Sequence, residues 1–539
     1  MAEIELVLGL LIVVAAFTSV ARRLRIPYPI VVVLGGSILG FVPGLPQVTL
    51  NPDLVFLFFL PPLLYVSALF SSFSDFRANL QQISLHAFGL VLLTTCAVSV
   101  VAHIAIDGLT WPAAFALGAI LSPTDAIAAT TIVKHLGIPQ RVVTILEGES
   151  LINDATAIVI YRVAVGAVVT GAFSVWKAGL EFVAGSIIAV LVGLAVGWTI
   201  VRARRYLIGD SPVLQNTIAL LTPFIAYLPA ENFPISGIHV SGILAVVTTG
   251  LYTGWHTADL LSPRTRLQGY AVWEMVDFLL NGLAFILLGL QFQSILRGLS
   301  EQPVLTLVLY AGLISLTVII VRIAWVFSST YIPRFVSRRL RERNSLPSPQ
   351  QAWLIAWIGN RGVISLAAAL SLPLFTDTGT SFPQRDLLIF LTFCVILATL
   401  VLQGLALPAL VHRLHSEDDE TVKQEENKAK VEISRAALTR IEELRNEEWV
   451  GDDMAERLQE YYDYRQRRFA ARFDGDTAED GDEGEDYEEH SAAYKRFLRE
   501  LLQAQRRALV RLHREGEISD EAMRQVEYDI DLEEARLEE

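Results

Sequence analysis

The chain has 539 residues, of which 53% are hydrophobic and only 19% are charged. Soluble proteins carry closer to about 25% charged residues, so this composition argues against an ordinary soluble protein. The charge is also unevenly distributed: residues 1–412 hold 22 Lys and Arg against 19 Asp and Glu, and residues 413–539 hold 21 against 38. We therefore expect an apolar body of net charge +3 and an acidic tail of net charge −17.

The body consists of repeated apolar stretches of about 20 residues, the length that crosses a hydrocarbon core about 30 Å thick. The pattern predicts an all-α, polytopic membrane domain with about thirteen spans. Two of them, 30–46 and 212–229, are short and interrupted by Gly or Pro. The thirteen predicted spans are 4–21, 30–46, 53–71, 82–106, 112–133, 142–169, 179–201, 212–229, 236–254, 271–294, 303–330, 350–374 and 387–411.

The charges of the connectors predict the orientation. The connectors taken alternately, starting after the first span, contain 16 Lys and Arg, whereas the others contain 3. Positive connectors stay in the cytoplasm, so we expect the N-terminus outside and the tail inside. The opening MAEIE is acidic and basic residues follow the first apolar run. Because a secretory signal peptide has the reverse order, we expect this span to be retained.

Polar residues interrupt the fifth span, ALGAILSPTDAIAATTIVKHLG. Pro123 lacks an amide hydrogen and should break the helix near Ser122–Asp125. A break frees backbone groups, which at membrane depth are tolerated only beside protein or a watery cavity. Secondary transporters build ion sites from such helices, and here Thr124 offers a carbonyl and a hydroxyl and Asp125 a carboxylate. The alternative is a simple kink in which Asp125 caps the second half-helix.

The sixth span, LEGESLINDATAIVIYRV, places Asp154 near the middle of the membrane, where a charged residue costs about 2.5–3.5 kcal/mol. On a helix, Glu147, Ser150 and Asp154 share one face, and Glu149 and Asn153 share the neighbouring face. A buried network that only holds helices together would explain the polar residues. Carboxylates outnumber their neutral partners, however, and this favours a functional site.

A third polar group lies in the twelfth span, WLIAWIGNRGVISLAAALSLP. Arg361 stands between Gly359 and Gly362, which indicates another interrupted helix. A guanidinium at that depth requires a partner, and the expected partners are Glu149, Asp154 and Asp125. The order of an interrupted span followed by a polar span recurs late in the chain, which suggests two inverted repeats.

The sequence contains no motif for ATP coupling or for hydrolysis. No Walker loop, HExxH motif or nucleophile elbow is present, so we expect neither an enzyme nor a cofactor. Cys96 and Cys394 lie in predicted spans without paired spacing, which indicates neither a disulfide nor a metal site. Gly193 and Gly197 form a GxxxG pattern, which we interpret as close helix packing.

Five segments in this order resemble one known family: SPTDAIAATTI, EGESLINDATAIVIYR, SGILAVVTTGLY, NGLAFILLGLQ and NRGVISLAAALSLP. The chain resembles the electroneutral sodium/proton exchanger branch of the monovalent cation:proton antiporters, in its bacterial form, over residues 5–412. The resemblance implies thirteen helices in two inverted repeats, a dimer interface domain, and a mobile core with two crossing broken helices.

The resemblance also implies roles for particular residues. Asp154 of the Asn153–Asp154 pair is similar to the essential carboxylate that binds either the cation or the proton. Thr124 and Asp125 resemble the unwound stretch that adds oxygen ligands, and Ser150 resembles a further ligand to the monovalent cation.

Glu149 resembles the partner of Arg361 in a structural ion pair. The chain departs from the family pattern at Val66, where an acidic residue is frequent, and at Asn360, where Met or a similar residue is usual. Because an acidic residue is missing at Val66, the sequence does not define the ion selectivity or the pH set-point of the exchange.

Together with these residues, the resemblance implies exchange of Na⁺, with Li⁺ as a second cation, for H⁺ by alternating access in a homodimer of the cell membrane. Competition of both ions for Asp154 suffices for exchange, and pH and sodium homeostasis would follow. The transported ions and membrane lipid are the expected partners, and nucleic acid is not. K⁺/H⁺ exchange, a cation channel and a membrane sensor without transport are the alternatives.

The tail, 413–539, has helical apolar spacing at 431–449 and 491–516, and Ser519 is a good N-cap for a shorter helix. The acidic stretch 474–490 lacks apolar anchors, so we expect disorder there. We predict a cytoplasmic, mainly helical extension of unknown partner, with a regulatory module as the alternative.

Overall fold

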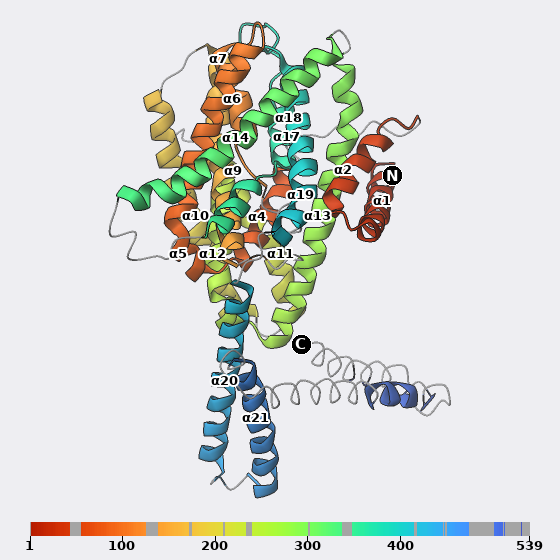
Figure 1. Cartoon of the computed structure of the whole chain (residues 1–539), viewed down its shortest axis with the longest axis vertical. Helices are drawn as coiled ribbons and strands as arrows, with labels where there is room; N and C mark the ends of the chain where they lie inside the picture. The colour runs from red at the N-terminus through yellow and green to blue at the C-terminus, as the bar shows by residue number, and fades with distance from the viewer. Residues whose placement is uncertain are drawn as a thin grey trace. The chain divides into compact units, whose positions relative to one another are not determined.

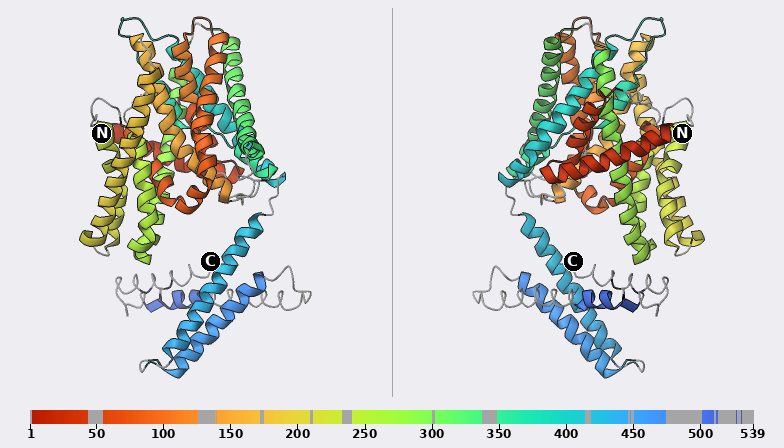
Figure 2. Two further views of the ribbon diagram at one scale, coloured as in Figure 1. Left: turned by 90° about the vertical axis from the view of Figure 1, so that its left-hand side faces the viewer. Right: turned by 90° about the vertical axis from the view of Figure 1, so that its right-hand side faces the viewer.

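The structure is a computed structural model of the chain (Figures 1 and 2). It divides into two compact units, Met1–Ser416 and Glu417–Glu539. The residues that it describes are 2–43, 55–125, 138, 140–171, 175–208, 211–232, 240–299, 302–336, 348–413, 418–445, 447, 450–473, 501–509, 511–512, 526 and 530.

The described part of the first unit is helical, apart from turns and one isolated bridge between Phe375 and Ser381. The predicted all-α class is therefore confirmed. The elements are α1 (Ala2–Leu24), α2 (Tyr28–Leu39), η1 (Val55–Phe59), α4 (Leu60–Phe70), α5 (Phe73–Ser84), η2 (Leu85–Leu90), α6 (Val91–Ala105), α7 (Trp111–Leu121), α9 (Gln140–Thr170), α10 (Val175–Ala203), η3 (Arg204–Ile208), α11 (Pro212–Asn232), α12 (Gly242–Leu260), α13 (Pro263–Arg297), α14 (Val304–Val336), α16 (Pro349–Trp357), α17 (Val363–Leu370), α18 (Arg385–Ala398), η4 (Thr399–Gln403) and α19 (Gly404–Arg413).

Eight continuous helical stretches in the described residues are long and apolar enough to cross a membrane, and three shorter apolar ones accompany them. A multi-pass membrane protein follows from this number. The short predicted span 30–46 corresponds to α2, and the predicted span 212–229 corresponds to α11. The exact number of thirteen spans remains a prediction.

Helix α9 occupies the interior of the bundle, where it contacts α7, α5, α12 and α16 (Figure 1). Small residues allow the neighbouring helices to approach closely. A Cβ at Gly193 of α10 would overlap the carbonyl of Ala245 in α12, and the Thr249 hydroxyl donates to the Gly193 carbonyl at 2.9 Å. The predicted packing role of Gly193 is thus confirmed, with α12 of the same chain as the partner.

Two helices stop in mid-bundle. The first is α7, which ends at Leu121 just before Pro123, and the second is α16, which ends at Trp357 before α17 begins at Val363. The backbone amide of Asp125 donates to the carbonyl of Asn360 at 2.7 Å, so the two interruptions touch. The predicted break near Ser122–Asp125 is confirmed, and residues 126–137 after it lie outside the described residues.

The second unit contains α20 (Asp418–Leu444) and α21 (Asp452–Phe473), which lie side by side and antiparallel (Figures 1 and 2). The predicted helix 431–449 therefore begins earlier and ends earlier than expected. The sequence interpretation missed α21, although the apolar residues of this helix recur at helical spacing along one face. Residues 501–509, inside the predicted helix 491–516, are helical. The predictions for 474–490 and for the segment after Ser519 lie outside the described residues.

Candidate cation site

A small cavity of about 30 Å³ lies where α9 meets the first interruption. Glu147, Ser150 and Asp154 of α9 line it together with Asp125. The sequence had placed these three α9 residues on one helical face, and their shared cavity confirms that prediction. The volume accommodates a small ion or a water molecule, since about 10–15 Å³ suffices for one water.

Asp154 is the most deeply buried carboxylate of this cavity, with 2% of its surface exposed. Its Oδ2 atom has no hydrogen-bond partner among the described residues. No Lys, Arg or His stands among the described residues that line the cavity. An isolated buried carboxylate is too costly to stay charged, so Asp154 requires either a proton or a bound cation.

The second face of α9 holds the interrupted segment in place. The Asn153 amide donates to the Thr124 hydroxyl at 2.8 Å, and that hydroxyl donates to Oε1 of Glu149 at 2.9 Å. Both the donor and an acceptor site of the Thr124 hydroxyl are therefore occupied by protein, and Thr124 does not line the small cavity. The structure thus places Asn153 and Thr124 beside the candidate cation site, where they connect α9 to the break.

Glu149 pairs with Arg322 of α14, and not with Arg361 as the sequence led us to expect. Oε1 lies 2.5 Å from Nη1 of Arg322, and Oε2 lies 3.4 Å from Nη2. Nδ1 of His86 lies 3.0 Å from Oε2. All three side chains are at most 1% exposed, so this cluster is a buried scaffold that neutralises Glu149.

The Arg361 guanidinium donates to backbone carbonyls instead of to a carboxylate, and its Nη2 has no hydrogen-bond partner among the described residues. Nε donates to the carbonyl of Leu121 at 3.0 Å, and Nη1 donates to the carbonyl of Gly359. Leu121 ends α7, so its carbonyl has no partner in the helix and carries part of the negative end of the helix dipole. The predicted Glu149–Arg361 pair is corrected for this reason: the interrupted helix supplies the negative partner.

The sequence interpretation missed Arg322, His86 and Asn281. Arg322 lies inside the predicted span 303–330, so an arginine in an apolar run was an available signal. His86 lies in the π-helical segment η2, and such segments are frequent at functional sites. Asn281 of α13 lines the small cavity. In the sequence it is a single amide residue beside the apolar run of NGLAFILLGLQ, which gave little indication that it faces this cavity.

Neither departure from the family pattern is among the described residues that line the small cavity. Val66 is 6% exposed and packs with Tyr65 and Trp273, away from the residues that line the small cavity. Asn360 contributes its backbone carbonyl to the contact with Asp125, and its Oδ1 has no partner among the described residues. We find no structural reason for asparagine at this position.

Gly362 follows Arg361 and packs directly on Asp125. A Cβ at this glycine would overlap the Asp125 carboxylate. We expect Gly362→Ala to displace Asp125 from the small cavity and to lower the exchange rate roughly tenfold, since a displacement of about 1 Å at a reacting centre can cost up to about hundredfold. Initial rates of cation-driven proton flux in proteoliposomes measure the effect.

Gly166→Ala is the matched control, because a Cβ there meets nothing within 4 Å and the residue lies on the same helix as Asp154. Equal rates for wild type and Gly362→Ala would show that the close approach to Asp125 has no part in exchange.

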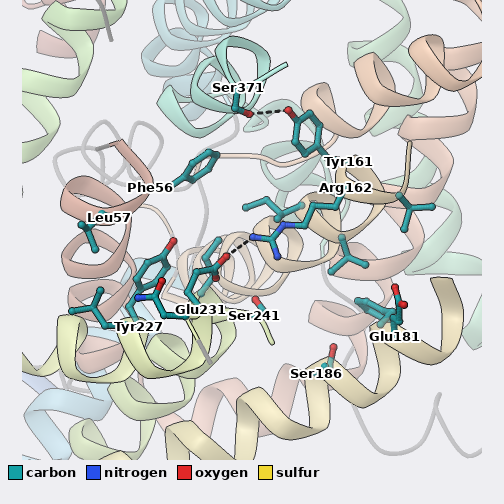
Figure 3. A pocket seen from close by; sticks show the side chains of 18 residues that line it. Phe56, Leu57, Tyr161, Arg162, Glu181, Ser186, Tyr227, Glu231, Ser241 and Ser371 are labelled. Carbon is teal, nitrogen blue, oxygen red and sulfur yellow. Dashed lines mark hydrogen bonds and ion pairs between the residues drawn. The ribbon is translucent and has the colours of Figure 1, made fainter. Parts of the chain in front are cut away.

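A larger cavity of about 470 Å³ begins one turn beyond Asp154 on α9 (Figure 3). Arg162 and Glu231 of α11 form an ion pair across it, and the Tyr161 hydroxyl lies 2.8 Å from that of Ser371. Because the positively charged Arg162 guanidinium lies in the larger cavity and repels a cation, the small cavity beside Asp154 is the better place for a cation.

Two interrupted helices that meet beside a buried, uncompensated carboxylate define a class of protein, the ion-coupled secondary transporters. The chain belongs to the sodium/hydrogen exchanger family, whose transmembrane domain matches residues 9–413. Sodium/proton antiport and sodium transport across a membrane are therefore the activities of its family, which consists of transporters and not of enzymes.

Similar proteins span most of the chain. An uncharacterized Na(+)/H(+) exchanger of Mycobacterium tuberculosis is 34% identical over 99% of this chain and 97% of its own length. The sodium, potassium, lithium and rubidium/H(+) antiporter of Bacillus pumilus is 33% identical over 83% of this chain and 67% of its own. The sodium proton antiporter MjNhaP1 of Methanocaldococcus jannaschii has a similar fold, with a TM-score of 0.60, 20% identity, and coverage of 75% of this chain and 99% of that one.

Proposed function

We propose that the protein exchanges Na⁺, with Li⁺ as a second cation, for H⁺ at the small cavity beside Asp154. One observation supports this most strongly: a carboxylate that is 2% exposed, without a partner for Oδ2, faces a cavity that Ser150 and Asp125 also line. Hard cations take oxygen ligands, and these side chains offer them. Thr124 does not line this cavity in the conformation described, so we propose its carbonyl as a further ligand that reaches the cation when the interrupted segment moves toward Asp154.

In this mechanism the proton and the cation compete for Asp154. The site is neutralised either by H⁺ or by Na⁺, so only the two loaded forms can cross the membrane at low cost. Because each form then carries the same net charge, exchange is electroneutral. Asn153, the residue before Asp154, is neutral and donates to Thr124. Asp154 is therefore the single carboxylate on this turn of α9 that exchanges its proton for the cation. No cofactor is required beyond the transported ions.

Access alternates between the two sides of the membrane in this proposal. The larger cavity, which begins one turn beyond Asp154 and contains Arg162, is the outer approach. The Arg162–Glu231 pair must separate when the helices that carry these residues move apart. We also propose the finer features of the fold: thirteen spans in two inverted repeats, two broken helices that cross, an outer N-terminus, a cytoplasmic tail and a homodimer. The contact between Asp125 and Asn360 supports the crossing.

K⁺/H⁺ exchange by the same site is the second candidate function. The Bacillus pumilus relative is named for sodium, potassium, lithium and rubidium, which favours a cation site of broad acceptance. The ligand types do not separate these ions, because small differences in ligand spacing decide which one binds.

Proton flux in proteoliposomes on addition of Na⁺, Li⁺ or K⁺ tests the proposal. We expect Na⁺ and Li⁺ to drive proton efflux at the same rate with and without a voltage clamp, since no net charge moves. A rate that follows the imposed voltage would contradict electroneutrality. No flux with any of the three cations would contradict transport and favour the membrane sensor.

A further inference from the structure

A third cavity, of about 440 Å³, lies away from the candidate cation site. It is formed at one end of the bundle, where α4, α10 and α12 end and α11 and α13 begin. None of the described residues that line it belongs to α7, α9 or α17. The cavity is therefore separate from both Asp154 and the interrupted helices.

Arg204 lines this cavity and is only 5% exposed. Its Nε and Nη2 atoms have no hydrogen-bond partner among the described residues. Arg322 and Arg361 are also buried, and each has one nitrogen without a partner, but Arg322 pairs with a carboxylate and Arg361 donates to backbone carbonyls. Among the described residues, Arg204 has neither kind of partner. Since an unpaired buried charge is costly, Arg204 indicates that an anion completes this site.

The rest of the lining agrees with an anion. Arg266 adds a second positive charge, and Asn216 and Thr257 add hydrogen-bonding groups. Among the described residues of the lining none is Asp or Glu. Tyr65 is an electrostatic neighbour of Arg204, but a phenol is neutral near pH 7, so it does not compensate the guanidinium.

The edge of the cavity identifies the source of the anion. Phe70 and Tyr270 line it, their rings are stacked at 5.0 Å, and both side chains are exposed. Exposed aromatic residues gather at the level of the lipid headgroups, and basic pockets between membrane helices bind anionic headgroups. An aqueous phosphate ion would gain nothing from this apolar edge, whereas the acyl chains of a lipid would.

We infer that this cavity is a binding site for an anionic phospholipid, with the headgroup phosphate between Arg204 and Arg266. The Arg204 guanidinium donates to the phosphate oxygens, which is the recognition that its planar fork favours. Asn216 and Thr257 contact the headgroup, and the acyl chains leave the cavity past Phe70 and Tyr270. The site is independent of the ion exchanged at Asp154.

Lipid binding to the purified full-length protein tests the inference. Native mass spectrometry and thermal unfolding in detergent would compare phosphatidylglycerol, phosphatidylcholine and inorganic phosphate. We expect phosphatidylglycerol to bind and to raise the unfolding temperature, and the other two to have little effect. Arg204→Gln should weaken phosphatidylglycerol binding about tenfold or more, because it removes a charge-assisted hydrogen bond.

Arg205→Gln is the matched control, because the adjacent Arg205 is exposed and the loss of charge is the same. Asn216→Asp covers the case in which Arg204→Gln fails to fold: the new carboxylate would compensate Arg204 inside the cavity, so the protein should be stable but no longer bind the lipid. Equal protection by inorganic phosphate would overturn the lipid assignment. Equal losses in Arg204→Gln and Arg205→Gln, or undiminished lipid binding by Asn216→Asp, would overturn the site.

Discussion

Asp154→Asn is expected to abolish cation-driven proton flux while the protein still folds. The amide has the size of the carboxyl group but cannot take up or release a proton, and it lacks the charge that holds a cation. Folding should be preserved, because the substitution removes a buried group that has no salt-bridge partner among the described residues. Flux in proteoliposomes and size-exclusion chromatography measure the two properties.

Asp107→Asn is the matched control, because it makes the same chemical change at an exposed carboxylate that lines none of the three cavities described above. That variant should retain exchange. Sodium-driven proton flux in well-folded Asp154→Asn protein would contradict the assignment of Asp154.

Arg322→Gln is expected to cause the largest loss of stability. The substitution leaves Glu149 buried with His86 and Thr124 as its remaining polar partners. Removing one member of a buried ion pair costs about 3–5 kcal/mol. We expect low expression and a lower unfolding temperature, measured by thermal unfolding in detergent, in addition to impaired transport.

The double variant Glu149→Gln/Arg322→Gln should recover part of the lost stability, because neither charge is then left alone. Arg162→Gln is the control for loss of an exposed pair, since 43% of the Arg162 side chain is exposed and such pairs contribute only about 0–1 kcal/mol. If Arg322→Gln unfolds at the wild-type temperature, the buried cluster does not stabilise the fold.

Patterns within one helix were predictable from the sequence. The 3.6-residue period alone placed Ser150 and Asp154 on one face and Glu149 and Asn153 on the next, and the structure confirms both groups. Pro123 likewise marked the interruption, because its effect on the backbone is local. The all-helical class followed from the length of the apolar runs.

Contacts between distant segments were less predictable. Arg361 was expected to need a carboxylate, but the interruption of α7 exposes the Leu121 carbonyl at the required place. The sequence indicates that α7 breaks, yet it does not show which way the freed carbonyl points. Glu149 had several candidate partners for the same reason, and the choice of Arg322 depends on how α14 packs against η2 and α6.

Proton release on sodium binding is the most direct test of the exchange at Asp154. Purified protein in weak buffer would receive Na⁺ while the pH is recorded. We expect wild type to release protons, and its apparent Kd for Na⁺ to rise about tenfold per pH unit at the acid end, as linkage of two competing ligands requires. Asp154→Asn should release none. Sodium binding that is independent of pH, or proton release that persists in Asp154→Asn, would contradict the competition.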